Sequence, residues 1–144
     1  MILYTDGASR GNPGPAGIGF ALYNKTEIII DGYYFLGNTT NNFAEAIAIL
    51  VALYTIKKNN ITNSLIIKSD SLLLINQFNG NYKIKNKSLA LVHILFKENF
   101  TNFNISFIHI DRTYNKYADS LANRGIDEKI LLSQELLSFL SSLF

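Results

Sequence analysis

The sequence predicts one α/β domain: a five-stranded mixed sheet, with three antiparallel strands followed by two parallel ones, flanked by helices. The first forty residues contain three strand-like runs separated by turn residues, which is typical of an antiparallel meander. After them, short apolar runs alternate with helical patterns, as in units whose strands pair in parallel. At 144 residues the chain can bury one core and is too short for two.

Each expected strand is an apolar run that ends at a turn signal. A loop rich in glycine and proline separates the first two, and tight turns are expected near Asn24-Lys25 and after Gly37. The expected strands are Ile2–Asp6, Gly17–Asn24, Glu27–Gly37, Ser64–Asp70 and Asn104–Ile110.

The expected helices follow from apolar spacing and end signals. The strongest has an amphipathic face formed by Phe43, Ile47, Leu50, Val51 and Tyr54, at the spacing of a helix. Capping residues and glycines then predict four more segments. They are Leu72–Phe78, Lys87–Phe100, a helix capped by Thr113 and running to Gly125, and a helical tail over Glu128–Phe144.

Composition and charge narrow the class of protein. Apolar residues make up 48% and charged ones 17%, as in a globular domain. The absence of cysteine excludes disulfides, thiolate metal sites and a cysteine nucleophile. Because the net charge is only +2, any basic surface must be local. No apolar run is long enough for a membrane span and no targeting segment is visible, so we expect a cytoplasmic protein without membrane contact.

Four acidic residues stand out because each lies in a distinctive local sequence. The segments are YTDGASRGNPGPAGIG around Asp6, TTNNFAEAIA around Glu45, IIKSDS around Asp70 and HIDRTYNKYADSLAN around Asp119. If the fold brings these carboxylates together, they form an oxygen cage for hard divalent cations. Such a cage is typical of enzymes that cleave phosphodiester bonds.

Asp6 and Glu45 also have structural interpretations. Asp6-Gly7 is a frequent hairpin turn, although the long loop that follows disfavours a turn here. Glu45 lies three residues after Asn42, so the pair can form a capping box at the start of the helix. Taken alone, Glu45 is better explained by capping, and only the other acids favour a metal site.

Asp70 and Asp119 have alternatives as well. Asp70 can cap the following helix, but Ser69 or Ser71 can do so equally well, which would free Asp70 to project from the sheet edge where ligands bind. Asp119 can lie on an exposed helix face. It shares a helix face with Asn115, four residues earlier, and it adjoins small apolar residues, where a carboxylate is costly without a cation.

Basic residues near these acids are candidates for phosphate contacts. Arg112 follows the last expected strand and is a better candidate than His109, which lies within that strand and is interpreted as structural. The segment YKIKNK places three lysines next to an aromatic residue, which suits a nucleic-acid backbone. These lysines are Lys83, Lys85 and Lys87.

Taken together, these segments resemble type 1 ribonuclease H over Met1 to about Gly125. The pieces that carry the resemblance are TDGASRGNPGPAGIG, TTNNFAEAIA, the SDS after an apolar strand, and RTYNKYADSLAN. The resemblance implies a ribonuclease H-like fold with a catalytic domain at residues 1–125. Residues 126–144 form a C-terminal helical extension outside the resemblance, which we expect to pack on the same domain.

The resemblance also implies an activity and its cofactors. The family hydrolyses the RNA strand of RNA–DNA hybrids with two Mg²⁺ ions, for which Mn²⁺ can substitute. By this resemblance Asp6, Glu45, Asp70 and Asp119 are the metal ligands, and oxygen ligands are those that such cations prefer. Crowded carboxylates repel one another, so at least one is expected to titrate high until metal binds.

The resemblance implies substrate contacts too. The loop around Asn12, including Gly7 and Ser9, matches positions that meet ribose 2′-hydroxyls, the group that distinguishes RNA from DNA. Asn42 matches a minor-groove contact, and Thr40 matches part of a pocket for a DNA-strand phosphate. The full set of expected substrate-binding residues is Gly7, Ser9, Asn12, Thr40, Asn41, Asn42, Asn115, Lys83, Lys85 and Lys87.

The best-known bacterial members have a histidine-bearing loop and a large basic protrusion, whereas here that region looks shorter, with YKIKNK as its only basic segment. A second departure is Leu72 after SDS, where those members often have a polar residue. The chain looks more like the short archaeal-type branch, in which an arginine at the position of Arg112 can take over the role of that histidine, with His109 as the fallback. That branch can include members that attack double-stranded RNA. Two other functions stay open: a non-catalytic nucleic-acid-binding module, and a nuclease of the same fold that acts on DNA. We expect a monomer, with a dimer through the C-terminal helix as the alternative.

Overall fold

The computed structural model describes all 144 residues and contains the expected mixed sheet. Its strand order is β3-β2-β1-β4-β5. The first three strands pair antiparallel, while β4 pairs parallel with both β1 and β5. The strands are β1 (Ile2–Ser9), β2 (Gly14–Asn24), β3 (Glu27–Thr39), β4 (Ser64–Ser69) and β5 (Asn104–His109).

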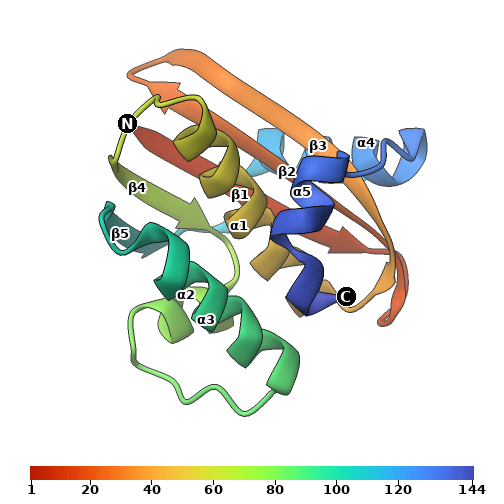
Figure 1. The fold of residues 1–144 in the computed structure, drawn as a ribbon. Coiled ribbons are helices and arrows are strands. Elements are labelled where there is room, and N and C mark those ends of the chain that lie inside the picture. The colour runs from red at the N-terminus through yellow and green to blue at the C-terminus, as the bar shows by residue number, and fades with distance from the viewer.

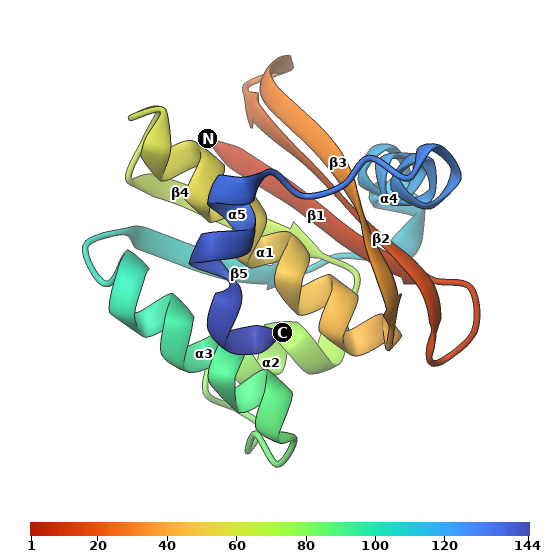
Figure 2. The same cartoon turned by 45° about the vertical axis from the view of Figure 1, so that its right-hand side comes forward.

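The helices cover both faces of this sheet. The helix α1 packs on β1 and β2 from one side, with α3 and α5 outside it, and α4 packs on β1, β2 and β3 from the other side (Figures 1 and 2). The bounds are α1 (Asn41–Lys58), α2 (Leu72–Phe78), α3 (Lys87–Phe100), α4 (Lys116–Glu128) and α5 (Gln134–Phe139), with short 3-10 helices η1 (Arg112–Tyr114) and η2 (Ser141–Leu143).

The first helix is buried on nearly all sides rather than on one face. Every residue from Phe43 to Leu53 is buried, and so is Ile56. The expected amphipathic face was therefore too narrow. The reason is tertiary: α1 lies between the sheet on one side and the helices α3 and α5 on the other (Figure 2).

The loop between the first two strands is much shorter than predicted. The ladder of β1 with β2 continues from the pair Asp6↔Gly19 to the pair Ser9↔Ala16, which leaves only residues 10–13 outside the strands. The prediction that the first strand ends at Asp6 was wrong, although Asp6-Gly7 does not form a turn. Glycines lie inside these strands because helices approach them closely. A Cβ on Gly17 would lie 2.3 Å from the carbonyl oxygen of Ala122 in α4.

Two further boundaries differ for physical reasons. The third strand runs past Gly37 to Thr39, since Gly37 (φ +79°) lies at an irregularity of the β2–β3 ladder instead of ending the strand. The helix expected to stop at Gly125 continues to Glu128, because Gly125 allows close packing on β3. A Cβ there would lie 2.3 Å from the carbonyl oxygen of Tyr34.

The start of α4 also differs from the prediction. Asp111 accepts a hydrogen bond from the Thr113 amide (2.9 Å) and caps η1, and α4 itself begins only at Lys116. The turn expected near Asn24-Lys25 is present, since Asn24 pairs with Glu27 across the hairpin.

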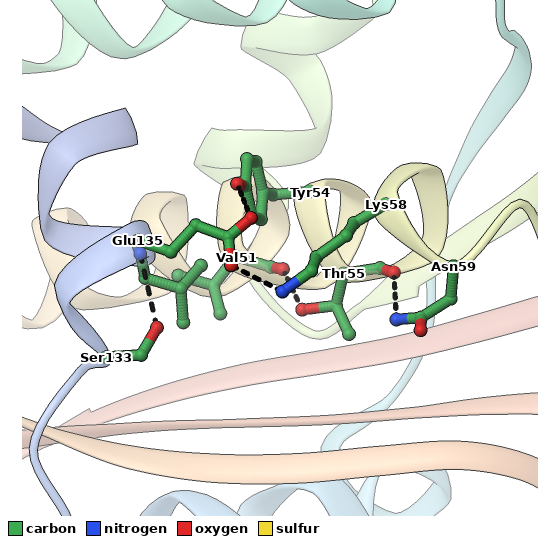
Figure 3. Close-up of polar contacts among 8 residues, drawn as sticks. Val51, Tyr54, Thr55, Lys58, Asn59, Ser133 and Glu135 are labelled. Atoms are coloured by element: carbon green, nitrogen blue, oxygen red, sulfur yellow. Dashed lines mark hydrogen bonds and ion pairs between the residues drawn. The ribbon is translucent and has the colours of Figure 1, made fainter.

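The tail is not one continuous helix. After α4 the chain is extended and bridges to β3 at Leu131, and then α5 and η2 return over α1. Leu132, Leu136 and Leu140 are buried in the same core cluster as α1. At the outer end of this contact Glu135 accepts hydrogen bonds from Tyr54 (2.5 Å) and Lys58 (Figure 3).

None of the helices combines the length and the apolar composition that crossing a lipid bilayer requires.

Candidate active site

Asp6 lies in the middle of the sheet on β1. A Cβ on the next residue, Gly7, would lie 2.3 Å from the backbone nitrogen of Glu45, so the glycine faces α1 and allows this helix to approach. Successive strand residues point to opposite faces, which turns Asp6 toward α4. There its side chain shares a hydrogen bond with Asp119. The approach that Gly7 permits brings α1 to this strand position, and α4 packs on the same strand from the other side.

Glu45 is part of the body of α1 and not of its cap. The Thr40 side chain accepts the hydrogen bond of the Phe43 amide (3.2 Å) and caps the helix, so the capping box with Asn42 was a wrong interpretation. Glu45 is only 7% exposed. Its carboxylate hydrogen-bonds to the side chain of Ser71. A buried acid that no helix end requires is a candidate ligand.

Asp70 follows β4 directly and does not cap the helix α2. Ser71 caps α2, because its hydroxyl accepts from the Leu74 amide (3.3 Å). Asp70 instead hydrogen-bonds to the side chain of Asn115. The Asn115 side chain is itself held by the carbonyl of Thr5, to which its Nδ2 donates (2.9 Å). Asn115 thereby ties the start of α4 to both β1 and Asp70.

The acids converge at one place. Ligand oxygens of Asp6, Glu45 and Asp70 all lie within 4.8 Å of one another. Asp119, in the first turn of α4, lies beside this group and contributes to the raised pKa of Asp6. All four acids line one cavity of about 430 Å³ that also contains Arg112. Four segments far apart in the sequence thus form one carboxylate site.

The electrostatics of the site are those of a group of acids that needs a cation. Burial, together with the nearby charges of Asp70 and Glu45, raises the pKa of Asp6 to about 9. Burial raises the pKa of Glu45 to about 7, against the effect of the Ser71 hydrogen bond. Burial also raises the pKa of Asp70, opposed by its hydrogen bond to Asn115 and by the charge of Arg112. A bound divalent cation would remove this repulsion and favour the ionised carboxylates.

Comparison with known proteins agrees with the fold. A family described as "Reverse transcriptase-like" matches residues 4–125. Ribonuclease HI of Halobacterium salinarum is 35% identical, over 87% of this chain and 63% of that protein. Ribonuclease H of Alcanivorax borkumensis is 35% identical, over 89% of this chain and 92% of that protein. This chain belongs to the ribonuclease H family.

A solved structure of the family also superimposes well. LC11-RNase H1, crystallised in complex with an RNA/DNA hybrid, matches with a TM-score of 0.83 at 34% identity, over 88% of this chain and 96% of that one. Not all relatives have this size. The chain spans only 35% of the length of mycobacterial proteins that are 31% identical to it.

The substrate-binding residues expected from the ribonuclease H resemblance fall into two hollows. Gly7, Ser9, Asn41 and Asn42 line the cavity of the acids. A neighbouring groove of about 680 Å³ is lined by Asn12, Thr40, Asn42, Lys83 and Lys85. Asn12 accepts a hydrogen bond from the Asn41 amide (3.1 Å), which joins the β1–β2 loop to the start of α1.

Three expected residues lie elsewhere. Lys87 is the first residue of α3 and borders neither hollow. His109 is exposed at the end of β5 and lines neither hollow either, whereas Arg112 borders the acids. Asn115 is buried behind Asp70 and not on the groove.

Three polar residues that line the acid cavity were not predicted as site residues: Arg10, Ser71 and Asn123. Asn123 follows Asp119 by one helical turn, and its Nδ2 donates to the Asp119 carbonyl (3.0 Å), so helical spacing could have identified it. Arg10 pairs with Asp127 on α4 (2.6 Å), a contact that no local pattern indicates.

Proposed function

We propose that this chain is a metal-dependent endoribonuclease that hydrolyses the RNA strand of RNA–DNA hybrids. The observation that carries the proposal is the convergence of Asp6, Glu45 and Asp70 within 4.8 Å, in a cavity that Asp119 also lines. Membership of the ribonuclease H family supports it, as does the similarity to a family member crystallised with a hybrid.

The donor set fits Mg²⁺, with Mn²⁺ as a substitute. The site offers carboxylate oxygens and neither imidazole nor thiolate, which is the preference of hard cations. The proposed ligands are Asp6, Glu45, Asp70 and Asp119. When bound, a pair of such ions supplies an activated water molecule and stabilises the charge on the leaving 3′ oxygen.

The remaining residues would bind and orient the two strands. Arg112 borders the acids and contributes positive charge to Glu45 and Asp70, so its guanidinium is placed to donate to a phosphate there. Gly7, Ser9 and Asn41 line the same cavity and would face the RNA strand. Asn115 holds Asp70 in position by its hydrogen bond.

The groove beside the acids would take the DNA strand. Thr40 and Asn42 line one part of it and Lys83 and Lys85 another, so hydroxyl, amide and ammonium donors surround one hollow of about 680 Å³. Donors of these types are suited to phosphate oxygens. Asn12 joins this groove to the acid cavity.

We further propose that residues 1–125 form the catalytic domain and residues 126–144 an extension packed on it. Leu132, Leu136 and Leu140 of this extension point into the core of the same chain. Because these leucines are already buried, they are not free to form a dimer contact, and we propose a monomer.

The function is tested with a labelled hybrid, duplex RNA, duplex DNA and single strands, in Mg²⁺, Mn²⁺ or chelator. We expect cleavage of the RNA strand of the hybrid in either metal and none in chelator. Asp70→Asn should lower the rate by about 1,000-fold or more, because one ligand of the cluster loses its charge. Glu98→Gln, an exposed carboxylate on α3, is the matched control and should cleave like the original chain.

Two results would contradict this function. Cleavage that persists in chelator, or equal cleavage by Asp70→Asn, would exclude the carboxylate mechanism. Tight hybrid binding without cleavage in either metal would indicate a non-catalytic binding module. The duplex RNA lane separates strict hybrid specificity from broader duplex activity.

A further inference from the structure

A third hollow lies beside the acids and takes no part in the proposed cleavage. Its volume is about 380 Å³, within the range of about 300–1,000 Å³ typical of small-molecule sites. Its lining is unusual in chemistry, because half of the eight tyrosines of the chain surround it together with a lysine and a buried amide. These residues are Tyr4, Tyr23, Tyr114, Tyr117, Lys25 and Asn115. We call it the tyrosine cavity.

The tyrosine cavity adjoins the acid site along β1. Tyr4 precedes Asp6 by two residues, so both side chains point to the same face of the sheet, about 7 Å apart along the strand. Tyr114 follows Arg112 by two residues. Asn115, which bonds to Asp70, forms part of the wall of the tyrosine cavity. The segment from Arg112 to Asn115 therefore borders both the acid cavity and the tyrosine cavity.

The lining combines aromatic surface with positive charge. The rings of Tyr4 and Tyr23 meet edge to face, with centroids 5.4 Å apart, and the Lys68 ammonium lies 5.8 Å from the Tyr4 centroid. Tyr114 is 76% exposed, so its ring is available to a ligand. The nearby Asp31 already accepts a hydrogen bond from Tyr117 (2.5 Å). Aromatic rings beside lysines disfavour a cationic ligand and suit a base that carries a phosphate.

Asn115 forms a fixed part of the cavity wall. It is 1% exposed, and its Nδ2 donates to the Thr5 carbonyl (2.9 Å), so the fold holds this side of the cavity in place.

We propose that the tyrosine cavity binds one unpaired nucleobase by stacking on its tyrosines, with Lys25 and Lys68 near the attached phosphate. The base would come from a single-stranded overhang of the hybrid, a source that rests on the proposed function, or from a free mononucleotide. Stacking is tolerant of base identity, and the larger rings of purines offer more surface to the tyrosines than uracil does.

Binding is tested by fluorescence anisotropy in chelator, so that no cleavage occurs. The probes are a blunt hybrid and the same hybrid with three unpaired adenosines added to the RNA strand, at either end in turn. One stacked base contributes about 1–3 kcal/mol, or about 5- to 150-fold in affinity. We expect one of the overhangs to tighten binding by at least fivefold. Tyr114→Ala and Lys25→Glu should remove most of this gain without changing the affinity for the blunt hybrid.

The chain offers matched controls. Lys129 is exposed and has a left-handed backbone like Lys25 (φ 53° and 58°), so Lys129→Glu reverses a charge in the same local setting. Leu131 is 70% exposed and matches Tyr114 in exposure, which makes Leu131→Ala the control for loss of a large side chain. Both control variants should keep the overhang gain.

Free nucleotides identify the source and the chemistry. Tyrosine ring resonances should shift with adenosine monophosphate, shift less with uridine monophosphate, and stay unchanged with ribose 5-phosphate. Shifts with adenosine monophosphate but no overhang gain would assign the cavity to free nucleotides. Equal shifts with ribose 5-phosphate, or no response to any probe, would overturn the proposal. Cleavage of the blunt hybrid by Tyr114→Ala shows independently whether the proposed function stands.

Discussion

Two carboxylates of the site are buried, which makes their ionised forms unfavourable in the absence of a cation. Asp6 and Glu45 are 5% and 7% exposed, and neither forms a salt bridge. Burial and mutual repulsion favour their protonated forms, which is the physical reason for the raised pKa values. Such electrostatic repulsion in the protein without metal is typical of functional sites, since a bound cation relieves it.

Because of this repulsion, we expect the stability of the protein to depend on pH. Folding raises the pKa of Asp6 from 3.8 to about 9 and that of Glu45 from 4.5 to about 7. Between these limits the folded protein binds more protons than the unfolded chain, so its stability falls as the pH rises. In chelator the melting temperature should therefore fall between pH 5 and pH 9, and Mg²⁺ should restore most of the loss at high pH.

Asp6→Asn is the matching variant for this prediction. Without metal it should melt higher than the original chain at pH 9 by about 3–8 °C, if removing the charge relieves 1–2 kcal/mol of repulsion. It should also respond less to Mg²⁺. The melting temperature is measured by calorimetry. If it rises with pH in chelator, the raised pKa values are contradicted.

At the scale of elements, glycines set the distance between α4 and the sheet. A Cβ on Gly19 would lie 2.5 Å from both the Ala118 carbonyl oxygen and the Ala122 nitrogen. With any larger residue at position 19, the backbone of α4 could not lie this close to β2. Since Asp119 is carried by α4, this spacing also decides where the fourth acid lies.

Gly19→Ala should displace α4 and with it Asp119. We expect a loss of about 1–3 kcal/mol in the free energy of unfolding, the usual cost of overpacking. Hybrid cleavage should decrease in the folded fraction as well. Asn24→Ala is an exposed change at the end of the same strand. It should alter the free energy of unfolding by no more than about 0.5 kcal/mol and leave hybrid cleavage unchanged. Equal stability of the two variants in urea unfolding would exclude the close approach.

The short helix α5 anchors the extension through one of two adjacent leucines. Leu136 is 4% exposed in the core cluster, whereas Leu137 is 40% exposed. Leu136→Ala should cost about 2–5 kcal/mol, the range for a buried leucine. Leu137→Ala should cost less than about 0.5 kcal/mol. A similar cost for both, measured by denaturant unfolding, would contradict the docking of α5 on α1.

At the scale of the whole molecule, charge is nearly balanced. A net charge of +2 gives little general attraction to nucleic acid, so affinity must come from local groups. Lys83 and Lys85 border the groove next to Thr40 and Asn42 and are the basic residues placed for it.

The salt dependence of hybrid binding should reveal this local charge. Each phosphate contact that is lost reduces the slope of log K against log[salt] by about 1. Replacing Lys83 and Lys85 together by glutamine should therefore reduce the slope by about 2 and weaken binding to all hybrid sequences alike. Lys129→Gln, on the far end of α4, should leave the slope unchanged. An unchanged slope in the double variant would place the DNA strand elsewhere.

Much of this architecture could be predicted from local patterns. The order of strands and helices follows from apolar periodicity, which depends only on neighbours along the chain. The positions of Asp70 and Asp119 on their elements were predicted as well, because strand ends and helix faces are local features. The same holds for the turn at Asn24-Lys25, which is confirmed by the pairing of Asn24 with Glu27.

What depends on distant neighbours could not be predicted. Glycines that usually mark a loop lie inside β1 and β2, because only the packed helices α1 and α4 show that a bare backbone is needed there. The burial of α1 on all sides and the broken path of the tail have the same origin, since both depend on which surfaces meet.

The sequence by itself therefore determined the kind of chemistry: four acids in recognisable segments, on elements of predictable type. Only the tertiary structure decided that Glu45 is a buried neighbour of Asp6 and Asp70 rather than a helix cap, and that four tyrosines enclose a cavity beside them. The physical reason is the same in both cases. Burial and convergence are properties of contacts between distant segments, and a local pattern does not contain them.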